Sequence, residues 1–299
     1  MSVTDGQVAI VETGDRSYGV NQSIDSLNIN PVKGKNVLIK PNFNTADPAP
    51  GSTHNETLVA LVKKLWDMGA TSIRLGERSF PPTQQVLAQK GVVPLLEPLD
   101  VQIIDFDTLK TGDWVKVNPE GSQWRDGFRI ARPILETECL VSTGCLKTHQ
   151  FGGVFTLSLK LHVGTVPTTR HGFDYMNELH MSPLQQQLIA EINAPFAPSL
   201  VVMDGVDTFV DGGPATGKRV NGNVFLAATD RVAVDAVGVA VLKALGSNPT
   251  IMNTKIFDHP QLARAAEIGL GVTSAADIHL VAADDASRSR VEKVAAQLY

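Results

Sequence analysis

The stretch NVLIKPNFNTADPAPGSTHNETLVALVKKLWDMGATSIRLG, residues 36–76, contains a strand, a helix and a second strand in direct succession. Residues 36–40 are a short apolar run that reads as the first strand. Thr53 stands three residues before a glutamate, which is the spacing of a capping box at the start of a helix. Apolar residues then recur every three or four positions until Gly69, which is expected to end the helix. Residues 72–76 form the second expected strand.

The same alternation continues on both sides of this stretch. Further strands are expected at residues 7–13, 102–105, 114–117, 128–131, 139–142, 200–203, 224–228 and 278–281, and further helices at residues 81–90, 184–192, 233–245, 261–268 and 287–298. Strands that alternate with helices predict an α/β fold, with a mainly parallel sheet and helices on both faces. We expect a single α/β domain over residues 1–299, in which residues 144–200 are a candidate sub-lobe that would give the molecule two lobes.

Composition argues against several classes of partner. The net charge is −5 and no Lys/Arg stripe is present, so a nucleic acid is not expected. The most apolar window, residues 232–245, includes Asp235 and Lys243 and is too short for a membrane span. Residues 1–16 do not read as a secretory signal, so we expect a cytoplasmic protein without a membrane partner.

Two cofactor classes are also not expected. Cys139 and Cys145 are the two cysteines of the sequence, and two thiolates without CxxC spacing cannot hold an iron–sulfur cluster alone. Residues 212–218 (GGPATGK) match the first seven positions of a phosphate-binding loop, but Arg219 stands where a serine or threonine is required. The residues that follow predict a strand and not a helix, so no nucleotide is expected.

Histidines are concentrated in the middle of the chain. Four of the seven, His149, His162, His171 and His180, lie within residues 149–180. Lysine, arginine and carboxylate side chains fall in the same window. Because imidazoles bind metals and transfer protons near neutral pH, this window is where we expect chemistry.

Three residues of this window are the catalytic candidates. Lys147 and His149 follow the strand expected at residues 139–142, and ligands of open α/β sheets bind at the carboxyl ends of strands. Lys160 lies in an apolar segment, where an ammonium is unfavourable unless it is paired. The alternatives are a solvated loop for the first two residues and a lysine whose ammonium reaches water for the third.

The candidate metal ligands lie mostly after residue 160. Two histidines and a carboxylate can form a facial set that leaves positions open for substrate, and Fe or Zn is the divalent metal expected. The candidate ligands are His162, His171, His180, Asp174 and Asp204. Their spacing matches no strict metal motif, and a polar surface loop is the alternative interpretation.

Substrate binding is assigned to polar groups at strand ends and loops. Lys40 ends the strand at residues 36–40 and Asn42 lies two residues further on, so Lys40 is expected at the same sheet edge as Lys147. Arg170 and Gly213 complete the set, since a tight glycine loop can approach a ligand closely. Together these residues predict a small anionic ligand.

These segments together resemble the bacterial and archaeal family catalogued as domain of unknown function 362, which is often fused to or encoded beside ferredoxin modules. The matching segments are Lys40-Pro41-Asn42, Gly69-Ala70, Lys147-Thr148-His149, Leu159-Lys160, Gly212-Gly213-Pro214 with Gly217, and Ala233-Val234-Asp235-Ala236. The resemblance implies an α/β fold and a shared polar site at Lys40, Lys147, His149, Lys160 and Asp235. The resemblance implies no particular activity, because the family has no general one. Leu161 stands where the family commonly has asparagine, and the ferredoxin cysteines are absent, which argues against an iron–sulfur role.

Three functions remain open from the sequence. The first is a metal-dependent enzyme, a mononuclear non-haem iron oxidoreductase acting on a small anionic substrate, and the number of histidines favours it narrowly. The second is a metal-free acid–base lyase or isomerase that uses Lys147 or His149 as the base. The third is a small-anion binding protein without catalysis. A homo-oligomer is compatible with all three.

Overall fold

The computed structural model describes residues 6–170 and 172–299. Among these residues, the main sheet has ten strands, with the order β14-β1-β13-β11-β7-β2-β3-β4, while β12 pairs with β11 and β8 with β7. Its strands are β1(Gln7–Glu12), β2(Asn36–Lys40), β3(Ser72–Glu77), β4(Val101–Asp105), β7(Cys139–His149), β8(Val154–Thr156), β11(Leu200–Gly212), β12(Gly217–Asn221), β13(Val224–Ala228) and β14(His279–Ala282). Two small ribbons are β5(Trp114–Val117) with β6(Phe128–Ala131), and β9(Thr169–Arg170) with β10(Phe173–Asp174).

The sheet is mainly parallel, as the alternation of strands and helices predicted. The pairs β14–β1, β11–β7, β7–β2, β2–β3 and β3–β4 are parallel. The strand β13 is antiparallel to both of its neighbours, β1 and β11. The α/β fold class is therefore confirmed, with one antiparallel strand inside the sheet.

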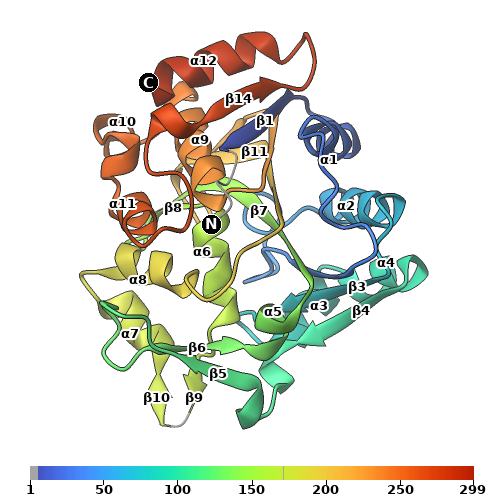
Figure 1. The fold of residues 1–299 in the computed structure, drawn as a ribbon, viewed down its shortest axis with the longest axis vertical. Helices are drawn as coiled ribbons and strands as arrows, with labels where there is room; N and C mark the ends of the chain where they lie inside the picture. The colour runs from blue at the N-terminus through green and yellow to red at the C-terminus, as the bar shows by residue number, and fades with distance from the viewer. Residues whose placement is uncertain (1–5, 171) are drawn as a thin grey trace.

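Helices cover both faces of the sheet (Figure 1). The α-helices are α1(Arg16–Asp25), α2(Asn55–Asp67), α3(Thr83–Gln89), α4(Val92–Leu96), α5(Arg132–Glu136), α6(Ser158–Leu161), α7(Tyr175–Met181), α8(Gln185–Ile192), α9(Arg231–Ala244), α10(Pro249–Asn253), α11(Pro260–Glu267) and α12(Arg288–Leu298). Short 3-10 helices are η1(Glu97–Leu99), η2(Phe106–Thr108), η3(Thr111–Asp113), η4(His162–Thr165), η5(Ile256–Asp258) and η6(Ala275–Asp277).

Alternation along the strands divides the core between these faces. In β1, Val8 and Ile10 pack in the cluster formed with α9, α11 and α12. Their neighbours Ala9 and Val11 pack in the cluster formed with α1, α2, α3 and α4. A strand with both faces covered is apolar at successive positions, which explains its continuous apolar run.

A third apolar cluster lies between the sheet and the β5–β6 ribbon. It combines Leu38 of β2 and Leu140 of β7 with Trp114, Phe128 and residues of α7 and α8. The expected sub-lobe at residues 144–200 starts inside β7 and so shares the main sheet. The division into domains stays a prediction.

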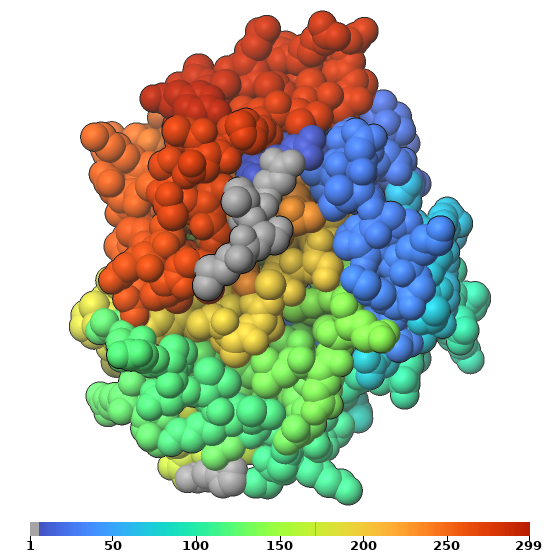
Figure 2. All heavy atoms as spheres, viewed as in Figure 1, coloured from blue at the N-terminus to red at the C-terminus, as the bar shows by residue number. Residues whose placement is uncertain are grey.

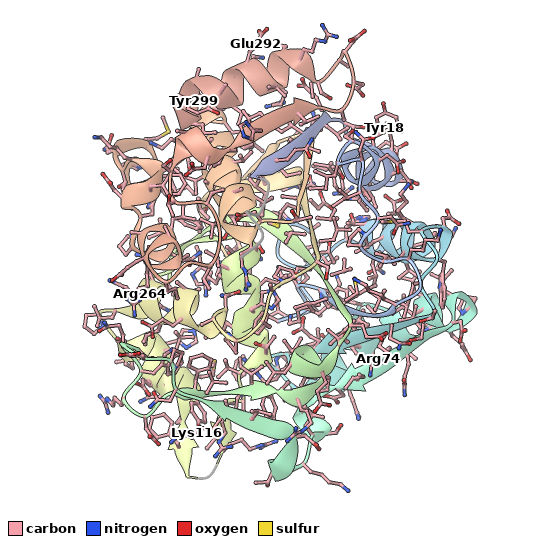
Figure 3. The ribbon with its side chains drawn as sticks, viewed as in Figure 1. Tyr18, Arg74, Lys116, Arg264, Glu292 and Tyr299 are labelled. Carbon is pink, nitrogen blue, oxygen red and sulfur yellow. The ribbon has the colours of Figure 1, made fainter. Side chains whose placement is uncertain are left out.

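The two ends of the described chain lie side by side. The strand β14 pairs with β1 in parallel, and α12 packs on the same edge. Figure 2 shows the C-terminal residues, in red, against the N-terminal residues, in blue. The labelled side chains Lys116, Glu292 and Tyr299 lie at the periphery, as their exposure requires (Figure 3). No helix within the described residues is both long and apolar enough to cross a bilayer.

Most predicted elements are confirmed, but three local predictions are wrong. The N-cap of α2 is His54, whose Nδ1 accepts a hydrogen bond from the Glu56 N–H, and not Thr53. The Thr53 hydroxyl instead accepts from the Asn42 N–H and so fixes the preceding loop. The strands expected at 139–142 and 200–203 continue to His149 and Gly212, because they pair with each other and with the hairpin strands β8 and β12.

The glycine-rich segment at residues 212–218 is a hairpin turn. It joins β11 to β12, which are antiparallel, and the strand expected after it is confirmed as β13. A hairpin offers no helix N-terminus to a phosphate. The expectation that no nucleotide binds stays a prediction.

Candidate functional site

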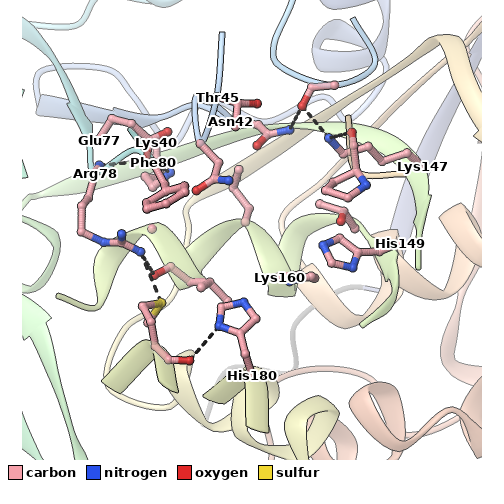
Figure 4. A pocket seen from close by; sticks show the side chains of 18 of the residues that line it. Lys40, Asn42, Thr45, Glu77, Arg78, Phe80, Lys147, His149, Lys160 and His180 are labelled. Atoms are coloured by element: carbon pink, nitrogen blue, oxygen red, sulfur yellow. Dashed lines mark hydrogen bonds and ion pairs between the residues drawn. The ribbon is translucent and has the colours of Figure 1, made fainter. Parts of the chain in front are cut away.

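A cavity of about 420 Å³ lies at the carboxyl ends of β2, β3 and β7. The loop after β2 and the segment from α6 to α7 close its sides. The charged and imidazole side chains that line it are Lys40, Glu77, Arg78, Lys147, His149, Lys160 and His180 (Figure 4).

Lys40 is held by a carboxylate. Its Nζ lies 2.6 Å from Glu77 Oε1 and donates to the Pro41 carbonyl at 2.7 Å. Glu77 also accepts hydrogen bonds from the backbone N–H groups of Phe43 and Arg78. Burial lowers the pKa of Lys40 and raises the pKa of Glu77, and the pairing opposes both shifts. The polar atoms of this side of the pocket are therefore satisfied within the protein.

A glycine makes room for this ion pair. A Cβ at Gly164 would lie 2.7 Å from Glu77 Oε1 and 3.1 Å from Lys40 Nζ. Both distances are closer than ordinary contacts, so a larger residue would displace the pair. Gly164 is therefore part of the construction of the pocket wall.

Lys147 is held by carbonyl groups. It lies in the extension of β7, opposite Thr156 of β8 and Phe209 of β11. Its Nζ donates to the carbonyls of Gly51 at 2.5 Å and Pro214 at 3.0 Å. Burial lowers the pKa of Lys147 to about 8. No carboxylate within ion-pair distance neutralises this ammonium among the described residues.

Lys160 is the least supported cation of the pocket. It lies in α6 and is 8% exposed, yet its Nζ has no hydrogen bond or ion pair to any residue that the structure describes. Burial and the nearby charge of Lys147 lower the pKa of Lys160 to about 8. In Figure 4 it carries no dashed line, in contrast to Lys147 and Arg78.

Asp235 positions the helix that carries Lys160. Its two carboxylate oxygens accept from the N–H groups of Ser158 at 2.7 Å and Leu159 at 3.0 Å, the first residues of α6. Burial raises the pKa of Asp235 to about 7. The resemblance gave Asp235 site status, and the structure places it behind the pocket wall as a helix cap.

The two imidazoles of the pocket both leave Nε2 free, but in opposite protonation states. His149 Nδ1 accepts from the Phe151 N–H at 3.2 Å, so the neutral ring carries its proton on Nε2. His180 Nδ1 lies 2.7 Å from the Met176 carbonyl, which can only accept, so the lone pair of His180 is on Nε2. Burial, followed by the charge of Lys160, lowers the pKa of His149 to about 2. Burial also lowers the pKa of His180.

Arg78 is a pocket residue that the sequence reasoning missed. Its guanidinium donates to the carbonyls of Val166 at 2.6 Å and Val163 at 3.3 Å, and to the Thr168 hydroxyl at 3.1 Å. It thereby ties the segment after α6 to the end of β3. Glu77 and Arg78 follow a strand just as Lys40 does, and this position would have identified them.

Part of the remaining wall is apolar. Phe80, Leu161, Val163 and Met176 line the cavity beside the charged groups. Phe80 is 72% exposed and lies on the opposite side of the pocket from His149 and Lys147 (Figure 4). A wall of this kind suits an organic ligand better than a bare inorganic anion.

His162 is a core residue. It is fully buried, its Nε2 lies 3.0 Å from the Ser142 hydroxyl, and its ring packs on Phe196. Burial holds the pKa of His162 well below its usual value. The structure therefore places this predicted metal ligand outside the pocket.

The two predicted carboxylate ligands have local partners. Asp204 accepts from the Arg16 guanidinium and the Thr57 hydroxyl. Asp174 is the N-cap of α7 and accepts from the Asn177 N–H. Neither residue lines the pocket. His171, the remaining predicted ligand besides His180, lies outside the described residues.

No group of three or more histidine, cysteine or acidic side chains with the arrangement of a metal site occurs within residues 6–170 and 172–299. The predicted ligands are therefore not brought together in the part of the chain that the structure describes. Divalent metal binding stays a prediction.

Two of the four predicted substrate-binding residues line the pocket. Lys40 and Asn42 are in its wall. Arg170 instead packs its guanidinium over the Trp114 ring, 5.6 Å from the centroid. Gly213 supports the wall from behind, since a Cβ there would lie 2.1 Å from the Thr148 carbonyl oxygen. Its neighbour Pro214 supplies a carbonyl to the pocket.

Fold and site together define an α/β protein with a cation-lined cavity at the carboxyl end of a mainly parallel sheet. The chain belongs to the family described as Domain of unknown function (DUF362), which matches residues 37–240. This match confirms the resemblance drawn from the sequence motifs.

Two further similarities were found. A thylakoid-associated protein of Synechocystis sp. is 24% identical over 245 residues, covering 76% of this chain and 74% of that protein. The solved structure of the lactate racemase apoprotein from Thermoanaerobacterium thermosaccharolyticum is 13% identical, with a TM-score of 0.46. That match covers 75% of this chain, which spans about half (54%) of the racemase chain.

Proposed function

We propose that the pocket binds a small organic anion and transfers a proton on it, as a lyase or isomerase does. The observation that carries this proposal is the charge of the wall. Four cationic side chains, Lys40, Arg78, Lys147 and Lys160, face one carboxylate, Glu77, among the described lining residues. With every lysine protonated and both histidines neutral, these lining residues carry four positive charges and one negative charge. An anionic ligand would offset part of this excess.

The size and chemistry of the cavity narrow the ligand class. A volume of about 420 Å³ is in the range of small-molecule sites. The apolar residues Phe80, Leu161 and Met176 give the carbon skeleton of a ligand a surface to contact. A small carboxylic acid with a short carbon chain fits both properties.

The imidazoles supply the acid–base chemistry. His180 Nε2 has a free lone pair and can accept a proton from the bound molecule. His149 Nε2 carries a hydrogen that can be donated to a developing oxyanion. These roles differ from the sequence hypothesis, in which Lys147 or His149 was the base, because Lys147 donates to two carbonyls and the acceptor nitrogen of His149 is occupied.

A metal-dependent oxidoreductase receives less support from this geometry. His180 is the one predicted ligand within the described residues that lines the pocket, and no described carboxylate accompanies it except the ion-paired Glu77. The proposal of an acid–base enzyme is therefore preferred on the positions of the chain's own groups.

NMR in D₂O tests the proposal with malonate, and with malonamide as the neutral control. Malonate should bind saturably and malonamide should bind at least tenfold more weakly, because a charge-assisted hydrogen bond contributes about 1.5–3 kcal/mol. Bound malonate should exchange its methylene protons for deuterium with EDTA present. Lys147→Met should weaken binding, and Arg170→Ala should not.

The outcomes separate the three hypotheses. Equal affinity for malonate and malonamide would reject the anion site. Binding without exchange would indicate a binding protein. Exchange that EDTA abolishes and Fe²⁺ or Zn²⁺ restores would favour the metal enzyme.

A further inference from the structure

The ammonium form of Lys160 is poorly supported by its surroundings. Lys40 has a carboxylate partner and Lys147 has two carbonyl partners, but the Lys160 amine has none among the described residues. An ammonium in a buried site is destabilised by several kcal/mol unless acceptors surround it. The neutral amine loses less on burial, and it has the lone pair that a nucleophile requires.

The groups beside Lys160 do not supply the missing negative charge. The electrostatic neighbours of Lys160 include Lys147, which is cationic, and the imidazoles of His149 and His180, which are neutral. Glu77 is already occupied by Lys40. The pocket therefore combines an unpaired amine with a hydrogen-bond donor on His149 and a proton acceptor on His180.

We propose that Lys160 forms a Schiff base with a small oxo acid whose carboxylate is bound by the other cations of the pocket. This inference rests on the anion site proposed above and names its substrate class. The ligand must carry a carbonyl group as well as a carboxylate. Imine formation turns the adjacent carbon–hydrogen or carbon–carbon bond into one that can be broken at neutral pH.

The step requires no oxidant or reductant. The lone pair of Lys160 Nζ forms a bond to the carbonyl carbon, and the π electrons of the carbonyl move to its oxygen. The His149 Nε2–H donates a hydrogen bond to that oxygen as it becomes negative. His180 Nε2 carries the two amine protons in turn from nitrogen to oxygen. The carbon–oxygen bond then breaks, and the oxygen leaves as water.

Two residues outside this chemistry hold the amine in place. Asp235 caps α6 through the N–H groups of Ser158 and Leu159. A Cβ at Gly153 would lie 2.7 Å from Cε of Lys160, so the lysine stem packs directly on this glycine. Gly153→Ala should therefore displace the amine without removing any polar group of the pocket.

Reductive trapping tests the inference. The full chain is incubated with glyoxylate, the smallest oxo acid, and with sodium cyanoborohydride near pH 7.5, and the adduct is located by peptide mass spectrometry. Near this pH, a lysine with a pKa of about 8 has on the order of a hundredfold more neutral amine than a lysine with the ordinary pKa of about 10.4. Labelling of Lys160 should exceed that of the exposed Lys116.

Matched variants and a competitor define the site of reaction. Malonate should protect Lys160 but not Lys116, which pairs with Asp126 on the surface. Lys160→Met should remove the protected adduct while the fold, checked by circular dichroism, persists. Gly153→Ala should slow labelling, and Arg170→Ala should leave it unchanged.

The possible results distinguish the Schiff base from the anion site. A malonate-protected adduct on Lys160 supports the Schiff base. Malonate binding without a protected adduct on Lys160 overturns the Schiff base and leaves the anion site standing. If malonate does not bind at all, both the anion site and the Schiff base that rests on it are rejected.

Discussion

The two sides of the pocket treat a buried lysine in opposite ways. At the ends of β2 and β3, Lys40 is 1% exposed and paired with a carboxylate that is equally buried. In α6, Lys160 is 8% exposed and has no partner among the described residues. The first arrangement stabilises the protein once it has formed. The second leaves an interaction for a ligand to complete, so identical residue types in one cavity differ in what they contribute to folding and to binding.

The largest expected effect on stability comes from removing one partner of the Lys40–Glu77 ion pair. Lys40→Met leaves Glu77 buried without its counter-charge, and removal of one partner of a buried ion pair lowers the free energy of unfolding by about 3–5 kcal/mol. Urea denaturation at pH 7 measures the loss. Because Lys40→Met/Glu77→Gln removes both charges, it should recover part of the stability. Equal stability of wild type and the single variant would show that the pair is not formed.

Replacement of the unpaired Lys160 is expected to raise the stability of the protein instead of lowering it. The pKa of Lys160 is lowered to about 8 in the folded state from 10.5, so the folded protein binds fewer protons than the unfolded chain between these values. The destabilisation is full below about pH 8 and is relieved as the pH rises to 10.5. Lys160→Met should therefore be more stable than wild type at pH 7, by up to about 3 kcal/mol.

Denaturation at pH 7 and near pH 10.5 checks this sign. The advantage of Lys160→Met should disappear at the higher pH, where the amine is neutral in both states. A variant that is less stable than wild type at pH 7, with no dependence on pH, would mean that Lys160 is stabilising and has a partner.

A smaller effect is expected from crowding the ion pair. Gly164→Ala places a methyl group against the Lys40–Glu77 pair, and overpacking of this kind typically lowers stability by about 1–3 kcal/mol. Gly112→Ala is the control, because a Cβ there meets no atom within 4 Å. Thermal unfolding of both variants measures the difference. Equal melting temperatures would show that the pocket wall accommodates the added methyl group without loss of stability.

The smallest effect is expected outside the pocket. Arg170→Ala removes a cation–π contact with Trp114, which is worth about 0.5–1 kcal/mol at an exposed site. Its malonate affinity should equal that of wild type, because Arg170 does not line the cavity. A tenfold loss of affinity would place Arg170 in the site, as its sequence position had suggested.

The fold was largely predictable because its pattern is local. The run at residues 36–40, the amphipathic helix after it and the strand at residues 72–76 all carry their own apolar period. The extension of β7 to His149 was not predictable, since residues 144–149 mix polar and apolar types and are held by pairing with β8 and β11. The predicted N-cap of α2 was wrong for a similar reason, because the Thr53 hydroxyl accepts a hydrogen bond from the Asn42 N–H in the preceding loop.

The sequence identified pocket residues at strand ends and also in the histidine-rich window, where Lys160 and His180 line the cavity. Lys40, Lys147 and His149 were identified by their position after apolar strands, and the structure brings them to one cavity. His162 and Asp204 lie in other surroundings, because closeness in sequence does not determine which way a side chain points. The number of histidines in one window therefore did not identify which of them share a cavity, whereas Lys40, Lys147 and Lys160 all line it.

The length of β7 has a consequence for recognition. Lys147 lies where this strand is bonded on one side to β11 and on the other to β8, so its backbone is fixed by two ladders before any molecule arrives. When a ligand binds in the cavity, little free energy is lost in immobilising the Lys147 backbone, because it is already fixed. Selectivity among similar ligands should then depend on the side chains from α6 and α7 that line the cavity, such as Leu161 and Met176.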